Sequence, residues 1–135
     1  MNLIFSSLDK ALKSLKKAIE RSQAAPEDEE LRDAVIQRFE YSMDLSWKMI
    51  QRMLKEAGIQ ESEFRTKRDL FREGAKIGLL ADPVKWFAYY EARNLTSHSY
   101  DQKIAQLIYE ETIHFFPDAQ QLLIELEKMN KKNNA

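Results

Sequence analysis

The sequence predicts an all-α fold, an up-and-down four-helix bundle with an additional short helix. Only three glycines and three prolines interrupt the 135 residues, and strong helix formers fill the segments between them. Apolar residues also recur at spacings of three and four, which is the period of a helix with one buried face. For a chain of this length we expect a single domain over residues 1–135.

Two long helices are expected at the start of the chain, over about residues 3–23 and 28–57. The first carries an apolar stripe on one face, formed by Phe5, Leu8, Leu12, Leu15 and Ile19. Ala25 and Pro26 separate the two helices, and Gly58 closes the second. At 1.5 Å per residue the second helix would be about 45 Å long, so we expect it to form the backbone of the bundle.

Capping signals place the next two helices. Thr66 and Asp69 have the spacing of a capping box and predict a third helix, which ends near Gly78. This helix would carry the apolar residues Leu70, Phe71 and Ile77. Asp82 followed by Pro83 is typical of a helix start, with aspartate as the cap and proline at the first helical position.

A fifth helix is expected to begin after a cap at Asp101. Its apolar side would be formed by Ile104, Leu107, Ile108 and Phe115. Pro117 has no backbone N–H and clashes with the preceding turn, so we expect a kink or a restart of the helix there. A last segment would carry Leu122, Leu123 and Leu126, and residues 130–135, NKKNNA, are interpreted as a frayed tail.

Composition narrows the functional classes. The chain contains no cysteine, no secretion signal and no apolar run of about 20 residues, so we expect a soluble cytoplasmic protein without a membrane span. Its net charge of −1 argues against nucleic-acid binding through bulk positive charge. Residues 65–76 are locally basic, which permits a phosphate-bearing partner, although most charge runs are solvated faces.

The segment RNLTSHSY, from Arg93 to Tyr100, gathers polar and titratable side chains. On an ideal helix Arg93 and His98 lie about 140° apart, so they cannot meet on an uninterrupted helix. Either the helix ends between them, or they act with residues from elsewhere, including another subunit. If it ends near Ser97, its dipole favours the imidazolium form of His98. Thr96 and Ser97 could instead be ordinary helix-end hydroxyls.

A polar stripe on the second helix, formed by Glu40, Asp44 and Lys48, has two interpretations. It is either a solvated face with internal salt bridges, or Glu40 or Asp44 holds the guanidinium of Arg93. The chain shows no cluster of carboxylates and histidines with metal-ligand spacing, so we expect neither a metal nor a cofactor.

Three blocks and a single tryptophan carry a resemblance to a known family. They are DAVIQRFEYSMDLSWKMIQRMLKEAGI at 33–59, TKRDLFREGAKIGLLAD at 66–82, Trp86, and RNLTSHSYD at 93–101. In this order and spacing they resemble the nucleotidyltransferase substrate-binding proteins. These form a branch of the HEPN superfamily (higher eukaryotes and prokaryotes nucleotide-binding domain). The resemblance covers nearly the whole chain and implies a HEPN-like bundle that forms a homodimer.

The superfamily signature is an arginine followed, after four to six intervening residues, by a histidine. A polar residue often comes directly after the arginine. The signature falls here on Arg93, Asn94 and His98, and the longer form Arg-x-x-x-x-His-x-Tyr adds Tyr100. The resemblance implies a toxin that cleaves RNA without a metal, with Arg93, Asn94 and His98 as its catalytic residues. A partner minimal nucleotidyltransferase, the antitoxin, would attach AMP to Tyr100. We expect Ser97, Glu40, Asp44 and Lys48 to contact the substrate.

Two further hypotheses stay open on the sequence. The chain could be a non-catalytic subunit that binds nucleotide, or presents substrate, in a two-component nucleotidyltransferase. It could also be a helical interaction module in which RNLTSHSY has only a structural role. A neighbouring reading frame with a Gly-Ser pair and an Asp-x-Asp motif would favour either nucleotidyltransferase-paired hypothesis over the structural one.

Overall fold

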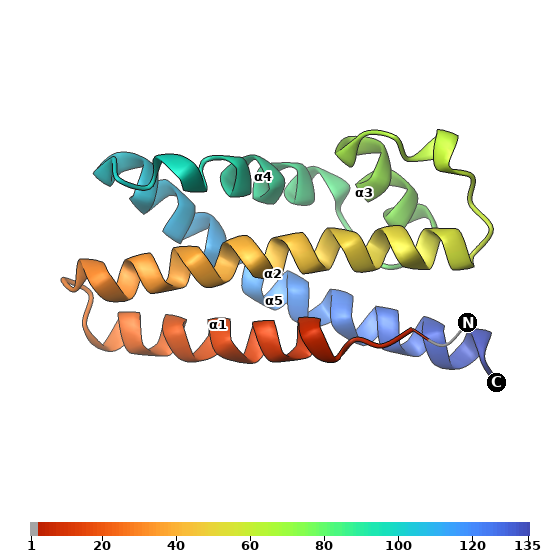
Figure 1. The fold of residues 1–135 in the computed structure, drawn as a ribbon, viewed down its shortest axis with the longest axis horizontal. Coiled ribbons are helices and arrows are strands. Elements are labelled where there is room, and N and C mark those ends of the chain that lie inside the picture. The colour runs from red at the N-terminus through yellow and green to blue at the C-terminus, as the bar shows by residue number, and fades with distance from the viewer. Residues whose placement is uncertain (1–2) are drawn as a thin grey trace.

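The computed structural model describes residues 3–135, and within them it contains five α-helices, two short 3-10 turns and no strand. The helices are α1 (Ser6–Ala24), α2 (Glu29–Glu56), α3 (Lys67–Lys76), α4 (Pro83–Asn94) and α5 (Gln102–Asn133), and the 3-10 turns are Glu61–Glu63 and Thr96–His98. Helices α1, α2, α4 and α5 run alternately in opposite directions, with α3 beside α2 and α4 (Figure 1). The predicted all-α fold is confirmed.

The three predicted helix caps are present in the structure. The side chains of Thr66, Asp82 and Asp101 each accept a hydrogen bond from a backbone N–H two or three residues further on, at 2.9 to 3.1 Å. These bonds satisfy N–H groups that have no partner within the helix. Helices α3, α4 and α5 therefore begin at the residue after each cap.

Two glycines with positive φ follow the ends of helices α2 and α3. Gly58 has φ of 80° and Gly78 has φ of 89°, a conformation that other residues adopt only with strain. Gly74, inside α3, has a different role. A Cβ at this position would lie 3.2 Å from Cγ2 of Ile50, so glycine lets α3 approach α2 closely.

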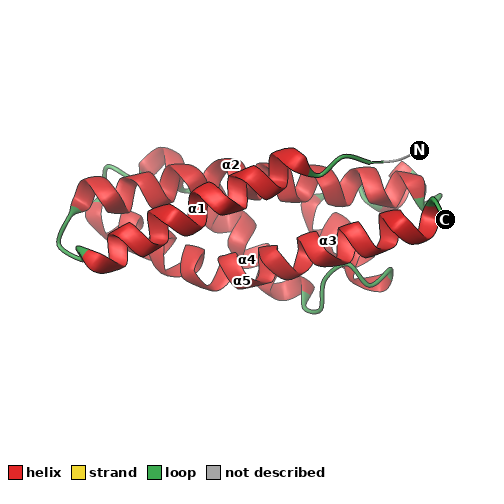
Figure 2. Cartoon of the chain, turned by 90° about the horizontal axis from the view of Figure 1, so that it is seen from below, coloured by secondary structure: helices red, strands yellow, loops and turns green. Residues whose placement is uncertain are grey.

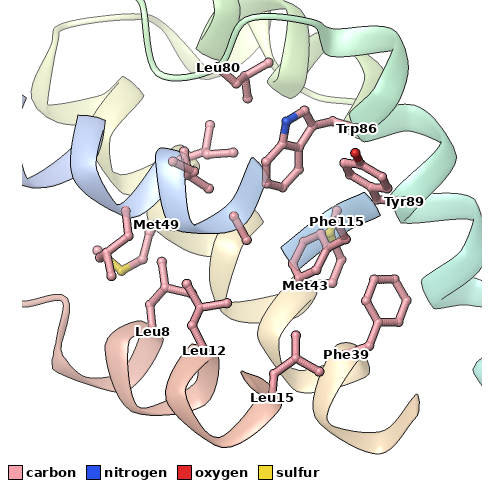
Figure 3. Close-up of a cluster of buried hydrophobic side chains, with 14 of the residues drawn as sticks. Leu8, Leu12, Leu15, Phe39, Met43, Met49, Leu80, Trp86, Tyr89 and Phe115 are labelled. Carbon is pink, nitrogen blue, oxygen red and sulfur yellow. The ribbon is translucent and has the colours of Figure 1, made fainter. Parts of the chain in front are cut away.

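The core lies around α2, which packs against each of the other four helices. Figure 3 shows Phe39 of α2 and Phe115 of α5 within this core, and their rings meet edge to face with centroids 5.1 Å apart. Trp86 and Tyr89 of α4 pack against the same Phe115 ring. The predicted stripe of α1 faces this core, with Leu8, Leu12, Leu15 and Ile19 buried and Phe5 partly buried.

The expected restart at Pro117 is wrong, because α5 continues without interruption from Gln102 to Asn133. Pro117 lies on the exposed side of α5, while the side chains of Phe115 and Ala119 are fully buried. The Tyr89 hydroxyl donates to the backbone carbonyl of His114 and to the carboxylate of Asp118. Packing and these bonds hold both turns beside the proline, so the helix does not break there.

Two smaller expectations about α5 are also wrong. Leu107 is predicted on the apolar side of the helix, yet it is 47 % exposed. Residues 130–133 belong to α5 rather than to a frayed tail. The side chain of Asn130 accepts a bond from the Leu3 N–H at 3.0 Å and donates to the Leu3 carbonyl at 3.1 Å. This pair ties the last turns of α5 to the start of the chain.

Figure 2 shows the helices running along a common long axis, with the α1–α2 connection at one end and the C-terminal end of α5 at the other. None of the helices in residues 3–135 is long and apolar enough to cross a membrane.

Candidate functional site

The segment RNLTSHSY lies across the end of α4. The helix ends at Asn94, and the Leu95 N–H bonds to the carbonyls of Glu91 and Ala92 at 3.2 and 3.1 Å. The Thr96 hydroxyl then donates to the Arg93 carbonyl at 2.8 Å. The helix therefore ends between Arg93 and His98, three residues before Ser97, and within residues 3–135 no hydrogen bond joins these two side chains.

Arg93 makes a two-point contact with a carboxylate on α2. Its Nε lies 2.7 Å from Oδ1 of Asp44, and its Nη2 lies 2.8 Å from Oδ2. Glu40, one turn earlier, is a looser neighbour at 3.6 Å from Nη2. Both side chains of the Arg93–Asp44 pair are 28 % exposed. Of the two interpretations of the polar stripe, the structure agrees with the one in which Asp44 holds the guanidinium of Arg93.

The pair shifts the titration of both partners. Partial burial by itself would raise the pKa of Asp44, but the hydrogen bonds and charge of Arg93, with help from Trp47 and Lys48, outweigh it and hold that pKa below its usual range. The hydrogen bond to Asp44 raises the pKa of Arg93, against a smaller opposing effect of burial. Asp44 is therefore an anion near neutral pH, and its two hydrogen bonds fix the orientation of the guanidinium.

The guanidinium keeps unused donors. Asp44 occupies Nε and one N–H of Nη2, while Nη1 has no hydrogen-bond partner within residues 3–135. A guanidinium carries five N–H donors in a planar fork that fits phosphate oxygens. Arg93 is thus fixed on one side by a carboxylate and can bind another anion through its other terminal nitrogen.

His98 and Tyr100 lie together on the connection between α4 and α5. Nδ1 of His98 is 3.3 Å from the hydroxyl oxygen of Tyr100, and the ring centroids are 6.0 Å apart. Both side chains are exposed, and Tyr100 is 79 % exposed. An imidazole and a phenol that both face solvent are accessible to a ligand or to a modifying enzyme.

The structure does not join the remaining candidate residues to His98 or Tyr100 by any hydrogen bond within residues 3–135. Asn94, Ser97 and Lys48 are exposed, and in the described part of the chain their side chains make no hydrogen bond. Lys48 lies 5.7 Å from the centre of the Trp47 ring. Over residues 3–135 no three histidine, cysteine or carboxylate side chains are grouped so that they could hold a metal ion.

Two residues beside the site were not singled out as site residues from the sequence. The indole N–H of Trp47 donates to Oδ1 of Asp44 at 3.4 Å, and Lys67 lies over the Trp47 ring at 3.9 Å. The spacing of three between Asp44 and Trp47 on α2 places them on one face and could have indicated the first contact. The second contact joins α2 to α3, and only the packing of these helices reveals it.

This bundle, with an arginine held in the last turn of a helix and an exposed histidine and tyrosine on the connection that follows, defines a small all-helical protein that carries an Arg-x-x-x-x-His-x-Tyr motif. The chain belongs to the family described as nucleotidyltransferase substrate binding protein like, whose model matches residues 3–128.

Individual relatives agree with this family. The chain is 37% identical over 98 residues to a protein of Haemophilus influenzae (strain Rd KW20) named "Probable ribonuclease HepT". The matched region covers 71% of this chain and 67% of that relative.

Solved structures support the fold. One is HI0074 of Haemophilus influenzae, whose structure is described as revealing the fold of a substrate binding domain of a nucleotidyltransferase. It is 30% identical to this chain and superposes with a TM-score of 0.84, and the match covers 92% of this chain and 99% of HI0074. A protein of Thermus thermophilus is 30% identical with a TM-score of 0.75, over 88% of this chain and 98% of that one.

Proposed function

We propose that this chain is a metal-independent endoribonuclease of the toxin type, held in check by a partner nucleotidyltransferase that attaches AMP to Tyr100. The observation that carries the proposal is the arrangement at the end of α4. Asp44 fixes Arg93 with two bonds, Nη1 of Arg93 has no partner within residues 3–135, and His98 is exposed four residues after the helix end. The similarity to a protein named as a probable ribonuclease supports it.

The reaction needs groups that these residues can supply. The 2′-oxygen of the RNA attacks the adjacent phosphorus, the bond from phosphorus to the 5′-oxygen breaks, and a proton passes from the 2′-hydroxyl to the leaving 5′-oxygen. Arg93 offsets the charge that gathers on the phosphoryl oxygens. His98 acts as base or acid for the proton, and Asn94 orients the phosphate. The products are a 2′,3′-cyclic phosphate and a 5′-hydroxyl.

One histidine cannot act as base and acid at the same moment, so the proposal includes a symmetric homodimer that brings two motifs together. Each motif would supply one histidine to a shared centre. Mixed dimers of wild type with His98→Ala would then have far less than half of the wild-type activity. A mixed dimer with half the activity would show that each subunit works alone.

Modification of Tyr100 would switch the enzyme off. The phenol oxygen attacks the α-phosphorus of ATP bound to the partner, pyrophosphate leaves, and the phenol proton is lost. The 79 % exposure of Tyr100 gives the partner access, and its hydroxyl lies 3.3 Å from His98 Nδ1. A bulky phosphodiester there would repel RNA phosphate and fill the space beside the imidazole.

Cleavage of RNA in excess chelator tests the proposal directly. We expect the wild type to cut RNA and leave 2′,3′-cyclic phosphate ends, and Arg93→Ala and His98→Ala to be inactive. His114→Ala is the matched control, because His114 is the other histidine and lies exposed on α5. Intact RNA with the wild type, or equal cleavage by His98→Ala, contradicts the proposal.

A second candidate function follows from the family description and from HI0074, which is described as a nucleotidyltransferase substrate-binding domain. In this case the chain binds a nucleotide or a substrate for its partner, and Arg93 grips a phosphate without any cleavage. Calorimetric titration of the wild type with nucleotides, alone and with the partner, tests it. Nucleotide binding that Arg93→Ala removes, together with intact RNA, would favour this function over the nuclease.

A further inference from the structure

A second surface feature lies next to Arg93, where cationic side chains cover partly exposed aromatic rings. Lys67 Nζ is 3.9 Å from the centre of the Trp47 ring and 5.8 Å from that of Tyr90. The guanidinium carbons of two arginines lie 4.7 and 5.2 Å from the Phe87 ring. We call this surface the aromatic-cation strip; its members are Trp47, Lys67, Arg68, Arg72, Phe87 and Tyr90.

The strip is continuous with the candidate site. Phe87, Tyr90 and Arg93 are spaced by three along α4, so they follow one face of the helix over about 9 Å. On α2, Trp47 is bonded to Asp44, which in turn holds Arg93. One end of the strip is therefore at the guanidinium proposed to bind phosphate, and the other end is on α3.

Two of the three aromatic rings, those of α4, pack against a buried ring beneath them. Phe71 of α3 is fully buried, and its ring centroid lies 6.4 Å from that of Phe87 and 6.2 Å from that of Tyr90. Phe87, Tyr90 and Trp47 remain only partly buried. A ring that is fixed on its inner side and covered on its outer side only by a cationic side chain offers a stacking surface once that side chain moves, with little loss of ring entropy on binding.

The cations of the strip are available to an anion. Lys67 has no carboxylate within 4.0 Å among the described residues and instead contacts the two rings. Arg68 and Arg72 pair with Glu91 and Asp69 at 3.1 and 3.4 Å, but all four side chains are well exposed, and such pairs contribute little. Since the whole chain has a net charge of −1, any affinity for a polyanion must come from such local surfaces.

We infer that the aromatic-cation strip is the binding track that leads single-stranded RNA to Arg93. The inference rests on the proposed nuclease function and adds the substrate class and its path. Unpaired bases stack on the Tyr90 and Trp47 rings, while Lys67, Arg68 and Arg72 bind the phosphates. Lys67 leaves the Trp47 ring face to the base and moves to the neighbouring phosphate. A duplex hides its base faces in the helix stack and therefore fits the strip poorly.

Binding measured separately from cleavage tests the track. Fluorescence anisotropy with a short single-stranded oligoribonucleotide is done in the His98→Ala background, so that RNA stays intact. Replacing all three cations, with Lys67→Gln, Arg68→Gln and Arg72→Gln, should weaken binding about tenfold or more and reduce the slope of log K against log salt by about 2. The control Lys10→Gln, Lys16→Gln and Lys17→Gln makes the same charge change on exposed positions of α1 and should alter binding less than about twofold.

Two more measurements address the stacking. Tyr90→Leu keeps an apolar side chain but removes the ring, and should weaken binding about fivefold or more. Circular dichroism shows whether each variant is folded, and Phe87→Leu provides a second ring variant. A duplex of the same RNA should bind at least about tenfold more weakly than the single strand.

Several results would overturn the track: no RNA binding at low salt, equal binding by the triple variant and its control, or equal affinity for duplex and single strand. Displacement of RNA by poly-glutamate, with no effect of Tyr90→Leu, would instead mark the strip as a docking surface for an acidic protein. Cleavage by the wild-type chain separates the two proposals. If the wild type cuts RNA but the strip variants bind RNA as well as the wild type, only the proposed binding track is contradicted. If RNA binds through the strip but the wild type never cuts it, only the proposed nuclease function is contradicted.

Discussion

The guanidinium of Arg93 on α4 and the carboxylate of Asp44 on α2 face each other through two hydrogen bonds of 2.7 and 2.8 Å. This contact fixes the plane of the guanidinium and uses only Nε and one N–H of Nη2. In the proposed reaction, Asp44 positions the cation and does not touch RNA itself. Its charge and its second oxygen are the properties that the first two predictions test.

Asp44→Asn should lower kcat for RNA cleavage about tenfold and leave KM nearly unchanged, because Arg93 loses its two-point support but keeps its charge. Steady-state kinetics with a fluorogenic RNA measure this split. Asp33→Asn, which removes another exposed carboxylate of α2, is the control and should behave as the wild type. Wild-type kcat in Asp44→Asn would mean that the pair has no part in catalysis.

The same pair should contribute stability that depends on pH. The pKa of Asp44 is lowered in the folded state, so the contribution is present above the unfolded value of about 3.9 and is lost as the pH falls through the folded pKa. We expect Asp44→Asn to be less stable than the wild type by about 1 kcal/mol at neutral pH, with the gap closing below about pH 4. Urea unfolding across this range measures it, and a gap that does not change with pH would contradict the assignment.

Tyr100→Phe should prevent AMP addition while RNA cleavage stays within about threefold of the wild type, because the proposed proton transfer uses His98 and not the phenol. Intact mass spectrometry after incubation with the partner and ATP detects the modification. Tyr41→Phe is a matched control, since Tyr41 is another exposed tyrosine. AMP on the Tyr100→Phe protein would place the modification elsewhere.

Tyr89→Phe should destabilise the bundle by about 1–2 kcal/mol at neutral pH, because it removes the hydroxyl that bonds to Asp118 and to the His114 carbonyl. Burial, followed by the bond with Asp118, raises the pKa of Tyr89 above its ordinary value. The folded state therefore keeps its phenol proton, and the stability from this group is lost as the pH rises above about 10. Thermal unfolding should show a smaller alkaline loss in Tyr89→Phe, and identical losses would refute the prediction.

Asn130→Ala should lower the free energy of unfolding by about 1–2 kcal/mol, since the two bonds to Leu3 are lost together. Chemical unfolding measures the change, and Lys132→Ala, at an exposed position in the same turns, is the control. Equal stability of the two variants would show that the bonds between Asn130 and Leu3 contribute nothing to the stability of the fold.

Local signals in the sequence were sufficient for most of the fold. The caps at Thr66, Asp82 and Asp101 act through hydrogen bonds to residues two or three positions away, so the local sequence is enough to predict them. Pro117 and Asn130 could not be interpreted in this way. The helix continues through Pro117 because Tyr89, 28 residues earlier, bonds to the neighbouring turns, and Asn130 bonds to a residue 127 positions away.

The candidate site shows the same division. The spacing of Glu40, Asp44 and Lys48 predicts one face of a helix, but it does not say which cation this face meets. The contact with Arg93 depends on how α2 packs against α4. In the same way, the position of Lys67 over Trp47 depends on how α3 packs against α2. The motif from Arg93 to Tyr100 was recognised by its resemblance to a family, and the exposure of Tyr100 became known only from the structure.

The bonds between Asn130 and Leu3 lie at the end of the bundle opposite the α4–α5 connection, and Figure 1 shows the C-terminal end of α5 there. A dye, affinity handle or fused domain attached after α5 would project away from Arg93, His98 and Tyr100. Surface-immobilised or fluorescent versions of the protein should therefore leave this surface as accessible to the proposed RNA substrate and partner enzyme as it is in the unlabelled chain.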